Sequence, residues 1–124
     1  MTMRRFRFLD WQVYRDARKL FVLLLSIVKK LPKEYRFEIG SQITRAGFSV
    51  VLNIAEGSGK HSDGELNRFF DIALGSLFEV VAAVDTLRET TLVEERVFRE
   101  VERLAESVSD QLGGFKRKIR SNQS

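Results

Sequence analysis

The chain has 124 residues, of which 44% are hydrophobic and 31% charged, with one proline and no cysteine. These values predict one folded domain over residues 1–124 and exclude a disordered chain, disulfides and thiolate metal sites. The formal net charge of +4 is mildly basic, and a chain without cysteine is compatible with a reducing compartment, so we expect a cytoplasmic protein.

The first predicted helix follows Asp10 and stops at Pro32. Asp10 is the expected N-cap, and the apolar stripe recurs at helical spacing: Val13, Ala17, Leu20, Leu24, Ile27 and Leu31. A second apolar side (Phe21, Val22, Leu25 and Val28) favours a contact with another subunit. The apolar run 20–28 is too short to span a membrane and too far from the N-terminus for a signal peptide, so no membrane association is expected.

The second predicted helix covers about 36–56 and ends at Gly57. Its core positions are Ile39, Ile43, Ala46, Val50 and Ile54. Gly40 and Gly47 lie seven residues apart on one face. Each costs up to about 1 kcal/mol relative to alanine in a helix, so we expect another helix to approach closely there.

Two capping boxes predict where the third and fourth helices begin. They are Ser62 to Glu65 and Thr91 to Glu94. The third helix is expected to bury Leu66, Phe69, Phe70, Ala73, Leu77, Val80, Val84 and Leu87. The stripe of the fourth keeps its spacing across Gly113 and Gly114, so the helix is expected to continue through both glycines.

The fold class predicted from these segments is all-α. No segment alternates as a strand does, and the connections are short, which favours an antiparallel up-down-up-down four-helix bundle with both termini at one end. Basic tails, about 1–9 and 116–124, would then form one patch suited to phosphate. Solvated tails without a ligand are the alternative. The clustered residues are Arg4, Arg5, Arg7, Lys116, Arg117, Lys118 and Arg120.

Five polar side chains form a row on one side of the second helix. This polar row comprises Gln42, Arg45, Ser49, Asn53 and Glu56. Folding the third helix back through residues 58–61 places Ser49 opposite Asp71, and Arg45 opposite Gly75, between Asp71 and Glu79. We therefore hypothesise a structural polar network in which Asp71 or Glu79 holds Arg45. The alternative is a row that faces solvent.

Side chains suited to catalysis are scarce in this chain. His61 is the only histidine, which excludes a His-based triad and a two-His metal site within one chain. The stretch Gly57-Ser58-Gly59-Lys60 lacks the first glycine and the final hydroxyl residue of a phosphate-binding loop, and no strand precedes it. We expect no enzymatic activity, no cofactor and no metal.

Three motifs resemble those of the four-helix-bundle proteins encoded in ribosomal-RNA intervening sequences. That family is similar to the accessory variability protein of diversity-generating retroelements. The resemblance implies a homopentameric ring and, less directly, association with nucleic acid and a reverse transcriptase. The motifs are the runs 41–49, Asn53 to Gly57, and Phe69 through 73–77 to Glu79.

The sequence leaves two functions open. The first is a nucleic-acid-binding or reverse-transcriptase accessory module, which would contact RNA or DNA through ten cations. The second is a structural or protein-interaction ring without a nucleic-acid role. A bundle that binds a small ligand or metal is a third reading. The ten cations are Arg4, Arg5, Arg7, Arg15, Arg18, Lys19, Lys116, Arg117, Lys118 and Arg120.

Overall fold

Helices make up nearly all of the chain in the structure, a computed structural model that describes residues 5–123 and the side chains of residues 5–119. No strand occurs within that range, so the all-α prediction is confirmed. None of the described helices combines the length and the hydropathy needed to cross a membrane. The elements are a 3-10 helix η1 (Arg7–Asp10) and the helices α1 (Gln12–Lys30), α2 (Lys33–Arg36), α3 (Glu38–Ser58), α4 (Asp63–Glu89) and α5 (Glu95–Gln123).

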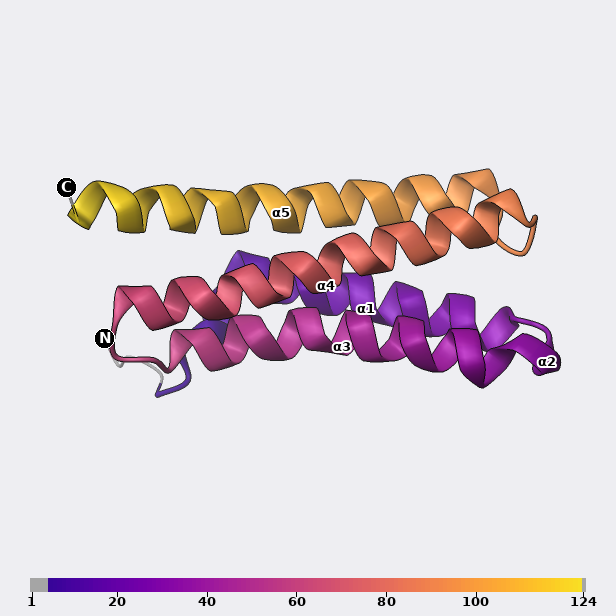
Figure 1. Ribbon diagram of the computed structural model, residues 1–124, viewed down its shortest axis with the longest axis horizontal. Helices are drawn as coiled ribbons and strands as arrows, with labels where there is room; N and C mark the ends of the chain where they lie inside the picture. The colour runs from indigo at the N-terminus through magenta and orange to yellow at the C-terminus, as the bar shows by residue number, and fades with distance from the viewer. Residues whose placement is uncertain (1–4, 124) are drawn as a thin grey trace.

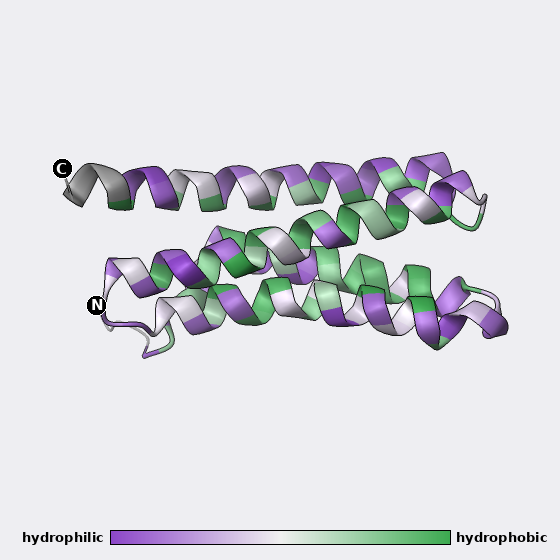
Figure 2. Cartoon of the chain, in the orientation of Figure 1, coloured by the Kyte–Doolittle hydropathy of each residue, from purple (hydrophilic) through white to green (hydrophobic). Residues whose placement is uncertain are grey.

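The four long helices lie side by side (Figure 1). Helix α3 packs against α1 and α4, and α5 packs against the same two helices. Apolar residues line the facing sides of the helices, and the outer side of α5 is mostly hydrophilic (Figure 2). The Trp11 and Phe115 rings lie 5.0 Å apart, so the start of α1 and the end of α5 share one end of the molecule.

The core draws on all four long helices. Among its fully buried side chains are Leu20, Ile54, Phe70 and Leu112, each at most 1% exposed. Complete burial of a large apolar side chain stabilises the fold by roughly 1.5–3 kcal/mol. The predicted stripes therefore do face the interior.

The start of α1 differs from the prediction. Asp10 is not the N-cap, because η1 occupies Arg7–Asp10 and Trp11 takes the cap position without a side-chain cap bond. The helix ends at Lys30, just before the extended Leu31 and Pro32, as expected. The short helix α2 then separates α1 from α3.

The end of α3 also differs. The helix continues to Ser58 with Gly59 as its C-cap, so Gly57 lies inside the helix. A Cβ atom at residue 57 would lie 3.1 Å from Phe69 Cβ and 3.2 Å from Leu66 Cδ1. The glycine permits close packing of α3 on α4 rather than ending the helix.

Gly40 and Gly47 do mark a close helix approach, which confirms that expectation. A Cβ atom at Gly40 would lie 2.7 Å from Val28 Cγ1, and one at Gly47 would lie 2.7 Å from Leu24 Cδ1. Both neighbours belong to α1. The lost helix propensity is offset by contact between α1 and α3.

The N-cap bond of one of the two predicted capping boxes is present. Ser62 Oγ accepts a hydrogen bond from the Glu65 amide at 3.2 Å, as predicted for the start of α4. The second box is wrong, because Thr91 has a left-handed backbone with φ of 63° and α5 begins only at Glu95. Helix α5 continues through Gly113 and Gly114, as expected.

Candidate functional site

One residue of the polar row, Ser49, bonds to α4, and a second, Asn53, bonds to Ser49 from within α3. Ser49 Oγ and Ser76 Oγ share a hydrogen bond of 2.8 Å between the two helices. The Asn53 side-chain amide donates to the Ser49 carbonyl oxygen at 2.8 Å and to Ser49 Oγ at 3.0 Å. These half-buried groups satisfy one another, and they fix how α3 and α4 align.

That alignment differs from the predicted one. Ser49 faces Ser76, whereas the sequence analysis placed it opposite Asp71. Gly57 packs closely on Leu66 and Phe69, which places the last turn of α3 against the first two turns of α4 in the same register.

The expected ion pair of Arg45 does not form within one chain. Arg45 is exposed and contacts no carboxylate among residues 5–119, and Asp71 instead forms an ion pair with Lys116 of α5. Gln42 and Glu79 are exposed and line a shallow depression of about 280 Å³. Glu56 pairs with Lys60 at 3.9 Å. The seven residues thus do not form one continuous network in a single copy.

Three sequence-distant segments meet at the end of the molecule that holds Trp11 and Phe115. Arg7 Nε donates a hydrogen bond of 3.1 Å to the Ser58 carbonyl oxygen, which ties the N-terminal segment to the end of α3. The Arg7 guanidinium also lies 5.3 Å from the centre of the Trp11 ring. We call this region the basic end; its cations include Arg5, Arg7, Lys116, Arg117 and Lys118.

Two cations near the α3–α4 turn were missed by the sequence analysis. Lys60 and Arg68 lie 4.9 Å and 4.7 Å from the centre of the Phe69 ring. Phe69 is on α4 near the turn, so both cations belong to the basic end. The available signal was their position in the sequence, Lys60 within the α3–α4 turn and Arg68 shortly after the start of α4. Of the predicted cations, Arg4 and the side chain of Arg120 lie outside the described residues.

The outer surface of α1 carries the other predicted cations. Arg15, Arg18 and Lys19 line a shallow depression of about 420 Å³ together with Val22. Arg15 donates to the Gln12 side chain at 3.1 Å, and Arg18 lies 4.9 Å from the centre of the Tyr14 ring. Within residues 5–119, none of these three cations forms an ion pair, so their charges are available to a ligand.

The cations between α4 and α5 at the opposite end are neutralised. Arg88 bonds Asp85 and Glu95, and Arg99 bonds Glu95 at 2.7 Å and Glu102 at 2.9 Å. Partial burial lowers the pKa of Arg88, but hydrogen bonds to Asp85 and Glu95 outweigh it and raise that pKa above its usual value. Arg88 therefore cross-links α4 and α5, whereas both partners of Arg99 lie on α5 itself.

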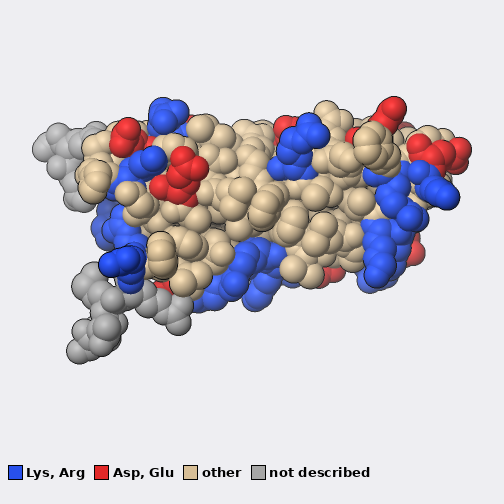
Figure 3. Space-filling model, turned by 90° about the horizontal axis from the view of Figure 1, so that it is seen from below, with Lys and Arg blue, Asp and Glu red and all other residues tan. Residues whose placement is uncertain are grey.

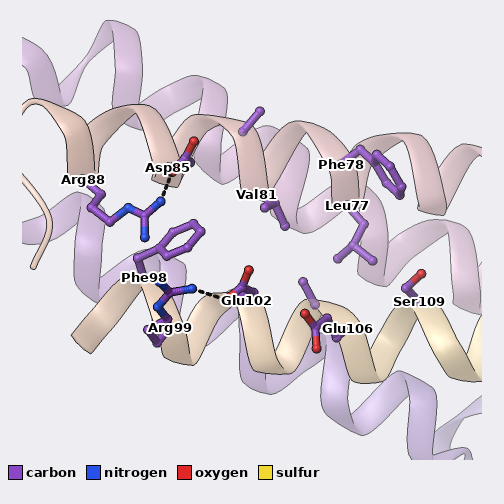
Figure 4. A pocket seen from close by; sticks show the side chains of 12 residues that line it. Leu77, Phe78, Val81, Asp85, Arg88, Phe98, Arg99, Glu102, Glu106 and Ser109 are labelled. Atoms are coloured by element: carbon purple, nitrogen blue, oxygen red, sulfur yellow. Dashed lines mark hydrogen bonds and ion pairs between the residues drawn. The ribbon is translucent and has the colours of Figure 1, made fainter. Parts of the chain in front are cut away.

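Phe98 lies between these two guanidinium groups, in the wall of a cavity of about 520 Å³ (Figure 4). Its ring centre is 3.8 Å from Arg88 Cζ and 5.7 Å from Arg99 Cζ. The cavity opens onto carboxylates of both helices, so it does not favour an anionic ligand. No cluster of three or more metal-binding side chains occurs among the described residues.

Figure 3 shows the charges on the side of the molecule seen from below. Lysines and arginines gather at both ends and along one edge, with a broad uncharged area between them. Exposed apolar side chains of α1 and α3 include Val22, Leu25, Phe48 and Leu52. The surface therefore combines cations with apolar area that a single copy leaves uncovered.

Residues 9–114 match the sequence profile of the 23S rRNA-intervening sequence protein family. A similar solved structure is a protein of unknown function from the S23 ribosomal protein family of Bacteroides thetaiotaomicron. It shares 21% identity and a TM-score of 0.75, over 81% of this chain and 94% of that chain. The comparison with curated proteins gives no match.

The fold and the profile together define an all-α protein of the ribosomal-RNA intervening-sequence class. The profile covers most of the chain, including α1, α3 and α4 in full. The chain belongs to the 23S rRNA-intervening sequence protein family.

Proposed function

We propose that this protein is a non-enzymatic nucleic-acid-binding module of the cytoplasm. The observation that carries the proposal is the unpaired state of Arg15, Arg18 and Lys19 on α1, in contrast to Arg88 and Arg99, which carboxylates neutralise. Cations held without a counter-charge attract phosphate, and binding releases the counterions of the nucleic acid. The basic end extends this surface with cations from three further segments.

Filter binding to RNA and to DNA at increasing salt tests the proposal. Each phosphate contact contributes about 0.9 to the slope of log affinity against log salt for duplex DNA. Replacing Arg15, Arg18 and Lys19 by glutamine should flatten that slope and weaken binding at low salt by about tenfold or more. No retention of either nucleic acid at low salt would exclude this function.

A matched control removes the same charge elsewhere. Lys29, Lys30 and Lys33 are exposed at the other end of α1 and in α2. Their replacement by glutamine changes the net charge equally. If binding depends on the α1 surface, the control should retain most of its affinity. Equal losses in the two variants would indicate attraction to net charge alone.

We also propose an antiparallel up-down-up-down four-helix bundle in a single domain that assembles into a homopentameric ring. The helix contacts support the bundle, since α1, α3, α4 and α5 each pack against two of the others. The exposed Val22 and Phe48, 66% and 46% accessible, support contact between copies. Light scattering should give the mass of a pentamer, and Val22→Ser with Phe48→Ser should reduce it.

A ring that only binds proteins is the second candidate function. The uncovered apolar side chains of α1 and α3 favour it, because they suit a protein surface better than a phosphate backbone. A reverse transcriptase is the partner that the retroelement resemblance suggests. Co-purification of such an enzyme with a ring that retains no nucleic acid would favour this candidate.

A further inference from the structure

Aromatic rings and arginines alternate along the N-terminal segment. The Phe6 and Phe8 ring centres lie 6.3 Å apart at 61°, and those of Phe8 and Tyr14 lie 4.8 Å apart at 69°. Arg18 then lies over Tyr14. We call Phe6, Phe8 and Tyr14 the aromatic row; it leads from the basic end to the cations of α1.

Phe6 is the exposed member of the aromatic row. Its side chain is 59% accessible, whereas Phe8 and Tyr14 are half-buried. A phenylalanine exposed to this degree gains little from the core of its own chain. Its apolar ring therefore remains available to a ligand.

The segment that carries Phe6 is held in place. The 3-10 helix η1 packs against α1 and α3, and the Phe6 carbonyl oxygen accepts a hydrogen bond of 3.1 Å from the Leu9 amide. The next residue, Arg7, is bonded to Ser58 and lies over Trp11. The ring is thus presented on an ordered segment, so little ordering is needed when a ligand binds.

We propose that Phe6 stacks on an unpaired base, and that the aromatic row and its arginines form a binding site for single-stranded nucleic acid. The proposal rests on the nucleic-acid binding proposed above and adds the kind of strand that is bound. Arg5, Arg15 and Arg18 contact phosphates along the same strand. Every base has a flat face, so such stacking does not depend on sequence.

Single strands are selected because duplex bases are already stacked and paired. A duplex presents its phosphates to Arg15 and Arg18 but offers no free base face to Phe6. Stacking on one aromatic side chain contributes enough free energy to change affinity by about tenfold. An anionic membrane fits the aromatic row less well, because only one of its three rings, Phe6, is more than half exposed.

The test compares a short fluorescent oligouridine with a duplex of the same length, using the full-length protein and fluorescence anisotropy. Phe6→Leu keeps an apolar side chain but removes the flat ring. It should weaken binding of the single strand by about tenfold and binding of the duplex by less than about twofold. Phe6→Trp keeps a flat aromatic ring, so it should bind the single strand about as tightly as the unaltered protein does.

Phe37→Leu is the matched control. Phe37 is 81% exposed and follows α2, so it lies at the other end of the molecule. Its replacement should leave both affinities unchanged. Because both phenylalanines are exposed, neither variant should affect folding, and circular dichroism would verify this.

The outcomes separate this proposal from the one on which it rests. If the unaltered protein binds neither strand form, both proposals fail. If it binds both forms with a steep salt dependence and Phe6→Leu has no selective effect, only the single-strand site is excluded. The site is also excluded if Phe6→Leu changes the mass of the assembly, or if it affects binding to phosphatidylserine vesicles and not to oligouridine.

Discussion

The guanidinium of Arg7 donates a hydrogen bond from Nε to the carbonyl oxygen of Ser58, at 3.1 Å and across 51 residues of chain. Its Cζ atom also lies 5.3 Å from the centre of the Trp11 ring. One side chain thus joins the N-terminal segment, the start of α1 and the end of α3. The position of η1, and with it that of Phe6, depends on this contact.

Arg7→Lys should loosen η1 while keeping the charge. Lysine lacks the flat guanidinium and its fixed donors, so we expect a loss of about 1 kcal/mol in stability and faster hydrogen exchange in residues 6–11. Urea unfolding and hydrogen-exchange mass spectrometry would measure both. Arg5→Lys, at a residue without a comparable contact in the described structure, should change neither.

Gly57→Ala and Gly75→Ala should have opposite effects. A Cβ atom at residue 57 would meet Phe69 Cβ, which is fixed to the backbone and cannot rotate away, so we expect a loss of about 1–2 kcal/mol. At Gly75 nothing lies within 4 Å, and alanine should stabilise α4 by up to about 1 kcal/mol. If urea unfolding showed that both substitutions stabilise the protein, that result would contradict the close packing of α3 on α4 at Gly57.

Asp16 is a buried carboxylate that joins α1 to α5. It accepts hydrogen bonds from Gln12 at 2.7 Å and from Gln111 at 2.8 Å, with Ser107 at 3.4 Å. Asp16→Ala would leave these donors without their acceptor, so we expect a loss of about 1–3 kcal/mol in thermal or urea unfolding. Asp16→Asn keeps an acceptor oxygen, so it should reduce the unfolding free energy by less. Ser107→Ala should reduce it least.

Arg45→Met should change the free energy of unfolding of a single copy by no more than about 0.5 kcal/mol. The reason is that the Arg45 side chain is exposed and forms no ion pair in the described structure. Phe70→Ala in the core should by contrast cost about 3–5 kcal/mol. Unfolding and light scattering should both be measured. A smaller assembly with unchanged stability would place Arg45 in a contact between copies.

Helical periodicity was enough to predict the helices and their buried sides. Leu20, Ile54, Phe70 and Leu112 are buried because the core excludes water from one stripe of each helix, and that stripe is visible in the sequence. The Ser62 cap was also predictable, because it involves only residues three positions apart. Local patterns therefore predicted the four long helices, but not the short elements η1 and α2.

The register between helices was not predictable in this way. The pairing of Ser49 with Ser76 follows from how closely Gly57 approaches Phe69, which is a contact between segments. The same holds for Arg45: Asp71, one of its two expected partners, pairs with Lys116 on α5, which is 45 residues further along the chain. Thr91 showed a box-like sequence but adopts a left-handed backbone, which a cap does not.

Thr91, which has a left-handed backbone, lies in the α4–α5 connection just before the longest described helix begins. Helix α5 has 29 residues and so extends about 43 Å, with Lys116, Arg117 and Lys118 near its far end. A tilt of about 5° at the connection would displace that end by about 4 Å if the rest of the helix followed rigidly. A change of backbone conformation at Thr91 would therefore be expected to shift the positions of the cations near the other end of α5.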